Sequence, residues 1–189
     1  MLIKSVLILL FVALSLDNYL VINRKGATIR DLSLQKTLLY SLVFTVANAI
    51  VLIVANLSSF LFESLLPANL EFFINISLLA ILGFFYIYKA INYNEFKEIL
   101  DKDFSFKKCV QLAFITSVDT FLIGIVLALL DVNFLLVLGN SALYTFIASI
   151  LGLRLGYSLG VKFPRALQGI AGGMYIIFSL VITLVYMVI

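Results

Sequence analysis

Long apolar segments alternate with short polar segments along nearly the whole chain. Six apolar runs are long enough to cross a bilayer, whose hydrocarbon core of about 30 Å takes about 20 helical residues. They lie at residues 2–23, 36–58, 70–92, 109–131, 134–157 and 166–188. The pattern therefore predicts an all-α membrane protein with six transmembrane helices and a lipid bilayer around it.

Composition supports the same class and removes several others. Of 189 residues, 63% are hydrophobic and 12% are charged, which is more apolar surface than a soluble domain of this size can bury. The net charge of +3 is modest and belongs to the connections, so we expect no nucleic-acid partner. A single cysteine and the absence of histidine exclude disulfides within the chain and any Cys/His metal cluster.

Basic residues gather in alternate connections. They follow the first, third and fifth runs, at Arg24, Lys25, Arg30 and Lys36, at Lys97, Lys102, Lys107 and Lys108, and at Lys162 and Arg165. The connections at residues 63–71 and 131–133 hold none. Because basic loops stay in the cytoplasm, we predict a multi-pass protein of the cell (plasma or inner) membrane with both termini outside. The first run could instead be a signal peptide, but it continues to Ile22, past the cleavage-like Ala13-Leu14-Ser15.

One short motif occurs twice, each time inside an apolar run. Ser15–Val21 and Ser117–Ile123 both read Ser, apolar, Asp, small polar, aromatic, Leu, branched aliphatic. The copies lie in the first and fourth predicted helices, an offset of three, so the second copy lies upside down relative to the first, as in a 3+3 inverted repeat. We predict a first repeat at 1–93, a charged cytoplasmic linker at 94–108 and a second repeat at 109–189, within a single transmembrane domain.

Asp17 and Asp119 occupy the same position in the two copies of the motif. Carboxylates in the hydrocarbon region are costly, and such residues usually have a function. Each could instead hydrogen-bond to a neighbouring helix or pair with a basic residue. Arg154, near the cytoplasmic end of its helix, is the one intramembrane cation that we identify, and it cannot neutralise both aspartates. An unpaired pair would be protonated or would hold a cation between them.

Neighbouring polar residues supply further oxygen atoms. Asn18 and Thr120 directly follow the two aspartates, and Asn48 lies in the second apolar run. On a regular helix adjacent side chains point about 100° apart, so Asp17 and Asn18 could both face a ligand only if the helix were broken there. Carboxylate, amide and hydroxyl oxygens suit hard cations such as Mg²⁺, Ca²⁺ or Mn²⁺. The predicted metal ligands are Asp17, Asp119, Asn48, Asn18 and Thr120, for a transported ion and with no cofactor.

The motifs, in this order and spacing, resemble those of one transporter family. They are Ser15–Asp17 followed by Arg24-Lys25-Gly26-Ala27-Thr28, Thr116–Asp119 followed by Ile123-Gly124, Val132-Asn133, the run through Gly152, Gly156 and Gly160, and Gly172-Gly173. The chain is similar to the MntP family of manganese efflux pumps, in the LysE transporter superfamily. This resemblance implies Mn²⁺ export and a part in it for Asp17 and Asp119.

Two positions depart from that family's pattern. Asn48 stands where its members commonly carry an acidic residue, and the proline that shortly follows there is missing. Asn18 replaces the usual alanine, and Leu16-Asp17-Asn18 is similar to TerC-type proteins of the same superfamily. Export of an amino acid or another small solute, and a non-transporting scaffold, are the alternative functions.

Two further expectations concern chemistry and energy supply. We expect no enzyme: intramembrane aspartyl proteases also use two aspartates, but in Tyr-Asp and Gly-x-Gly-Asp contexts, which neither Asp17 nor Asp119 has. The sequence shows no ATP-binding motif, so ion gradients or the membrane potential would drive transport, and antiport against protons is one hypothesis.

Overall fold

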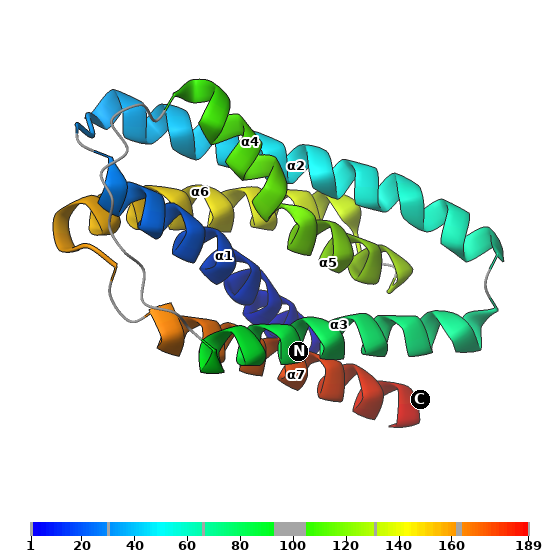
Figure 1. Ribbon diagram of the computed structural model, residues 1–189. Helices are drawn as coiled ribbons and strands as arrows, with labels where there is room; N and C mark the ends of the chain where they lie inside the picture. Colours follow the sequence, from blue (N-terminus) through cyan, green and yellow to red (C-terminus); the bar gives the residue numbers. More distant parts are fainter. Residues whose placement is uncertain are drawn as a thin grey trace.

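The computed structural model of the chain is helical throughout the part that it describes, residues 2–29, 31–65, 67–92, 105–130, 132–161 and 164–188. Its helices are α1 (Leu2–Thr28), α2 (Leu34–Leu65), α3 (Ala68–Ile91), α4 (Phe106–Thr116), α5 (Val118–Leu129), α6 (Phe134–Leu159) and α7 (Pro164–Val188) (Figure 1). The predicted all-α class is confirmed. Most of the predicted linker 94–108 lies outside the described residues, as do Asp131 and Lys162.

The predicted membrane spans are found in part. Four helices are long and apolar enough to cross a bilayer, over 34–60, 70–91, 134–159 and 164–184. The pair α4 and α5 meets at a bend of 41° and would make a fifth span if it crosses as one unit. α1, whose side chains before Ile8 are not described, is not among them. The chain is thus a multi-pass helical membrane protein.

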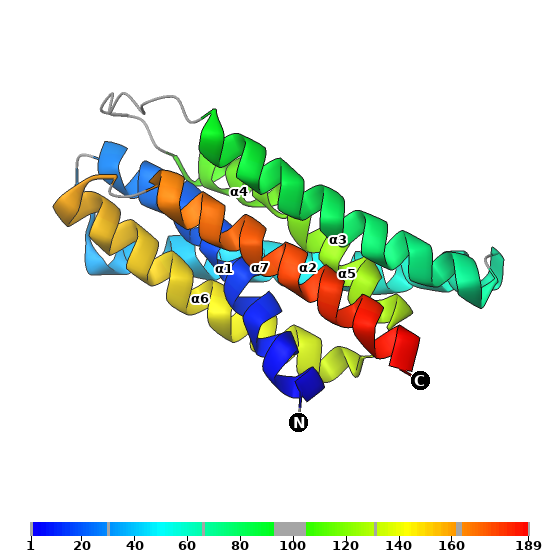
Figure 2. The same cartoon turned by 90° about the horizontal axis from the view of Figure 1, so that it is seen from below.

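The helices run alternately between two ends of an elongated bundle. α1, α3 and α6 finish at the left end in Figure 1, where α2, α4 and α7 begin. The turns from α2 to α3 and from α5 to α6 lie at the opposite end. Viewed from below, α1 passes between α6 and α7 (Figure 2), with both of which it is in contact. The helix ends next to the predicted basic connections therefore share one end of the bundle.

The two parts of the chain on either side of residues 93–104 are interlocked. Within the described residues, every substantial contact between helices joins α1–α3 to α4–α7, apart from the contact of α4 with α5. α1 packs on α6, and α2 packs on α4 and α5. α2 also packs on α6, and α3 on α7. Each part thus buries its apolar surface mainly against the other.

Glycines allow the closest of these approaches. The backbones of α1 and α6 come so near that a methyl group added at Gly156 would overlap the carbonyl of Asn23. A methyl at Gly152 would lie 3.0 Å from the carbonyl oxygen of Tyr19. Small residues at such crossings let helices pack without large side chains between them. This packing fixes α1 against α6 along the segment that follows Asp17.

Candidate functional site

The two motif aspartates meet inside the bundle. Asp17 of α1 is 5% exposed, and Asp119, in the first turn of α5, is half-buried. Their side chains interact with each other electrostatically, although 102 residues of chain separate them. The fold therefore brings together the two aspartates that occupy the same position in the two copies of the motif. In a low-dielectric interior two such carboxylates repel each other and favour a cation or hydrogen-bond donors nearby.

Tyrosines from two further helices complete this cluster. The Tyr86 hydroxyl of α3 donates a hydrogen bond to Oδ2 of Asp119 and also interacts with Asp17. The Tyr175 ring of α7 lies with its centroid 5.6 Å from that of Tyr86. Both tyrosines are 0% exposed, and the Tyr175 hydroxyl has no hydrogen-bond partner among the described residues. One oxygen of the cluster is therefore left for a ligand or water.

Among the described residues, the basic residue that interacts with Asp17 is Lys89 and not Arg154, the intramembrane cation identified from the sequence. Arg154 is exposed on the surface of α6. Lys89, in the last turn of α3, interacts electrostatically with Asp17. Its ammonium lies 5.5 Å from the ring centroid of Tyr86 and 5.6 Å from that of Phe85. The sequence analysis missed Lys89 because it stands at the end of a long apolar run, where lysines commonly reach out to water.

The helix break predicted as a possibility at Asp17-Asn18 occurs instead in the second copy of the motif. α1 is continuous from Leu2 to Thr28, through both residues. The helix carrying Asp119 is interrupted at Ser117 and bends by 41° there. The adjacent Thr116 and Ser117 hydroxyls both donate to the carbonyl of Ala113, at 3.0 and 2.8 Å. Serine and threonine bonds to the preceding turn are known to bend helices.

Asn48 takes part in a polar contact between α2 and α6. Its side-chain nitrogen donates to the hydroxyls of Ser141 and Thr145, at 2.8 and 2.9 Å. The amide is 1% exposed, and its Oδ1 has no hydrogen-bond partner in the described part of the chain. The structure thus places the nitrogen of Asn48 against α6 and leaves its oxygen available.

The remaining two predicted ligands are buried beside the aspartates in sequence. Thr120 is 0% exposed, and its hydroxyl lacks a partner among the described residues. Asn18 is 2% exposed. Among the residues described, no three His, Cys, Asp or Glu side chains gather as a metal-binding group. A cation here would therefore be held by the aspartate pair together with neutral oxygens.

Comparisons with known proteins agree on one family. The family model described as "Mntp: Putative manganese efflux pump" matches residues 31–183. A protein of Methanobrevibacter smithii, named "Putative manganese efflux pump MntP", is 30% identical over 187 residues, which are 95% of this chain and 96% of that protein. A protein of Acetivibrio thermocellus with the same name is 30% identical over 173 residues, which are 90% and 85% of the two chains. No solved structure matches the chain.

Proposed function

Because the chain belongs to the MntP family of manganese efflux pumps, we propose that it exports Mn²⁺ and binds the ion between Asp17 and Asp119. The observation that carries the site is the meeting of these two carboxylates in the bundle interior. Their two negative charges match one divalent cation, so the loaded pair is close to neutral. Oxygen ligands are those that Mn²⁺ accepts in proteins.

Neutral oxygens complete the proposed coordination shell. Thr120 Oγ1 and Asn48 Oδ1 are buried and lack hydrogen-bond partners among the described residues, which is costly unless a ligand satisfies them. Asn18 is buried, but α1 is a regular helix through Asp17 and Asn18, so their side chains point about 100° apart and Asn18 is not part of the proposed shell. The family resemblance implies a part only for the two aspartates, so the two neutral ligands are our own assignment. Loss of the acidic group that relatives commonly carry at the Asn48 position would make the site less negative.

We further propose six spans in a 3+3 inverted repeat, with both termini outside. The contacts support it, because exchanging α1, α2 and α3 for α4–α5, α6 and α7 maps the α2–α6 and α3–α7 contacts onto themselves and the other contacts between the halves onto pairs that are also in contact. The α1–α6 contact corresponds to that of α2 with α4 and α5, and the α1–α7 contact to that of α3 with α5. α1 would be the sixth span, since 27 helical residues extend about 40 Å.

Alternating access between the two repeats would move the ion. The break at Ser117, directly before Asp119, is the natural hinge, because interrupted helices commonly line the substrate sites of such transporters. Proton entry to the aspartates on the outer side would release Mn²⁺ and make the cycle an antiport. This coupling would be abandoned if Mn²⁺ flux into inverted vesicles ignored an imposed pH gradient.

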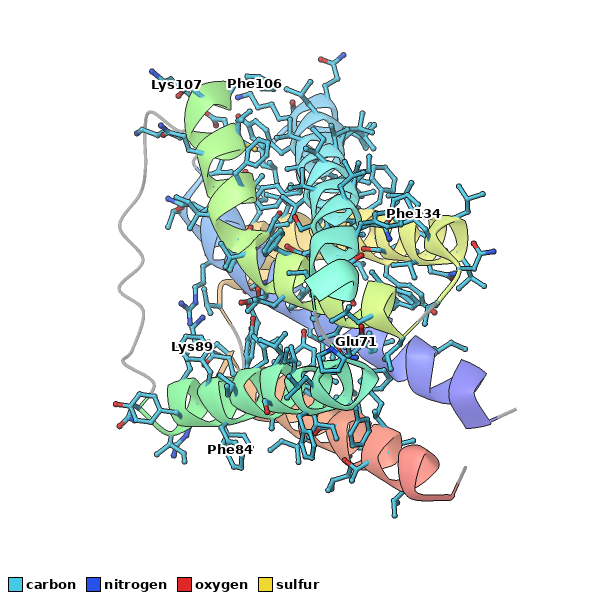
Figure 3. All side chains as sticks on the ribbon, turned by 90° about the vertical axis from the view of Figure 1, so that its right-hand side faces the viewer. Glu71, Phe84, Lys89, Phe106, Lys107 and Phe134 are labelled. Carbon is cyan, nitrogen blue, oxygen red and sulfur yellow. The ribbon has the colours of Figure 1, made fainter. Side chains whose placement is uncertain are left out.

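Mn²⁺ handling in a host without its own manganese exporter tests the proposal. Cells expressing the wild type should grow at Mn²⁺ concentrations that stop the host, and should hold less Mn²⁺. Asp17→Asn or Asp119→Asn should each remove at least about 90% of this effect, since one carboxylate cannot neutralise a divalent ion. Glu71→Gln is the matched control, because Glu71 lies at the far end of α3 from Lys89 (Figure 3) and should keep wild-type export.

The same growth assay with Ca²⁺, Co²⁺ or Cd²⁺ in place of Mn²⁺ shows which ion the protein exports. Protection against Mn²⁺ that survives in both well-expressed aspartate variants would contradict the site while leaving export intact. If the wild type protects against none of these ions, Mn²⁺ included, metal export is contradicted, and export of an amino acid or another small solute becomes the leading alternative.

A further inference from the structure

Lys89 is a charged side chain placed beside the aspartates by the fold. It lies on α3 one helical turn beyond Tyr86, and its ammonium sits near the faces of the Tyr86 and Phe85 rings. Figure 3 shows it on the side of α3 that faces the other helices, whereas Phe84 points away from the bundle. Phe84 is 65% exposed, as expected of a lipid-facing residue, while Lys89 is half-buried.

Lys89 offsets part of the negative charge of the cluster. When both carboxylates are ionised they carry two negative charges, and Tyr86 supplies only a hydrogen-bonding hydroxyl. Buried charges are stable when they are paired and hydrogen-bonded. The Lys89 ammonium interacts with Asp17 and is held by two aromatic faces, which attract cations. It is thus positioned to compensate the aspartates while no metal ion is bound.

We propose that Lys89 is a tethered counter-cation: its ammonium partly neutralises the aspartate pair in the empty transporter, and Mn²⁺ displaces it on binding. This inference rests on the proposed function and adds a positioning residue to it. An arriving divalent ion repels the ammonium, which can swing on its four-carbon stem toward water at the nearby end of α3. After Mn²⁺ leaves, the ammonium returns, so neither state holds two uncompensated carboxylates.

Thermal unfolding of the purified, metal-free protein tests the pairing without reference to transport. Lys89→Gln should lower the Tm by about 3–6 °C, because it leaves Asp17 without its counter-charge. In the Asp17→Asn background the same substitution should lower the Tm by less than about half of that. Lys89→Arg should stay within about 1 °C of the wild type. Equal Tm losses in both backgrounds would overturn the pairing.

Equilibrium binding of Mn²⁺ to the same purified proteins tests the competition. Lys89→Gln should bind Mn²⁺ on the order of tenfold more tightly, since the competing charge is gone, and should export it more slowly because release is harder. Arg165→Gln, which removes a positive charge from the start of α7, is the control and should bind as the wild type does. A purely structural lysine would give unchanged or weaker binding.

The two proposals fail in different ways. A wild type that binds and exports Mn²⁺, combined with unchanged affinity in a folded Lys89→Gln variant, overturns the counter-cation role alone. A wild type that neither binds nor exports Mn²⁺ overturns the proposed function and the competition with it. The unfolding experiment then still decides whether Lys89 and Asp17 are coupled.

Discussion

The two helices that carry the repeated aspartate motif differ in their backbones. α1 passes through Asp17 as one helix of 27 residues, whereas the helix of Asp119 is divided at Ser117 into pieces of 11 and 12 residues. The two motif strings match in residue type at every position, so the candidate sources of the difference are the residue before each motif and the surfaces against which the helices pack. Two related segments thus contribute to one site in different ways: α1 as a continuous helix, the fixed wall of the site, and α4–α5 as a helix that bends directly before its aspartate.

Hydrogen bonds to the preceding turn distinguish the two helices. In the second copy the Ser117 hydroxyl donates to Ala113 O, and the Thr116 hydroxyl donates to both Ala113 O and Leu112 O. The backbone N–H of Ser117 is shared between Ala113 O and Phe114 O. In α1 the corresponding Ser15 makes a single such bond, to Val12 O at 2.8 Å, and alanine and leucine precede it. A second hydroxyl competing for the preceding turn is therefore the local difference between the two.

The two helices that carry the motif also differ in how they pack on their neighbours. α1 meets α6 through backbone contacts at Gly152 and Gly156. α4 packs on α2 through side chains, and an apolar groove of about 310 Å³ lies along this contact, lined by residues such as Val43, Ala47 and Phe114. The continuous helix is thus held by close backbone packing, and the first half of the broken one by looser side-chain packing.

Glycine substitutions should show the largest difference between the two sides. Gly156→Ala should destabilise the protein by about 3 kcal/mol or more, because the new methyl meets backbone of α1. Gly124→Ala on α5 should cost less, since its methyl would lie 2.7 Å from Cβ of Ala55, whereas the methyl at Gly156 would overlap a backbone oxygen of α1. Thermal unfolding in detergent measures both, with Gly139→Ala, which has open space, as control. A milder loss at Gly156 than at Gly124 would reverse the assignment of the fixed wall.

Removing the extra hydroxyls should affect transport next most strongly. The double variant Thr116→Val, Ser117→Ala should lower Mn²⁺ efflux on the order of tenfold, because a straighter helix changes the placement of Asp119 and the bend that alternating access would use. Ser15→Ala is the matched change in α1 and should alter efflux less than about twofold. Efflux from preloaded cells, normalised to expression, gives the comparison. Equal losses in the two variants would argue against a hinge at Ser117.

Tyrosine substitutions should give the smallest effect and test which hydroxyl positions Asp119. Tyr86→Phe should lower Mn²⁺ efflux by roughly three- to tenfold, since a hydrogen bond to a buried carboxylate is lost. Tyr175→Phe should stay within about twofold, because that hydroxyl has no hydrogen-bond partner among the described residues. The assay is the one used for the helix variants. A stronger loss at Tyr175 would indicate that its hydroxyl binds the ion directly.

Sequence reasoning reached the broad class and the aspartates because both leave strong local signals. Apolar runs of bilayer length and a carboxylate within them are visible in single segments, and the family predicted from the motifs is confirmed. Tyr86, Tyr175 and Lys89 gave no such signal, since aromatic residues are common in membrane helices and terminal lysines usually face water. Their proximity to the aspartates arises only from the packing of α3 and α7 beside α1 and α5.

The position of the break was also beyond the sequence pattern. Asn18 suggested an unwound turn in α1, but the close packing of α1 on α6 maintains that helix. The competing bonds at Ala113 depend on the rotamers of Thr116 and Ser117, which no spacing rule specifies. The hydrogen bonds of the Asn48 nitrogen to Ser141 and Thr145, which leave the Asn48 oxygen as the unpartnered atom, likewise depend on how α2 packs on α6.

The interlocked contacts bear on how a cell makes this protein. Helices α1, α2 and α3 leave the ribosome before the helices against which they pack, so they must wait in the bilayer as separate inserted segments. During that wait Asp17 and Tyr86 lie in the bilayer without Asp119. Membrane chaperones and quality-control proteases would meet the nascent chain at this stage. Variants that delay synthesis of α6 should therefore reduce the amount of protein in the membrane before they reduce its activity.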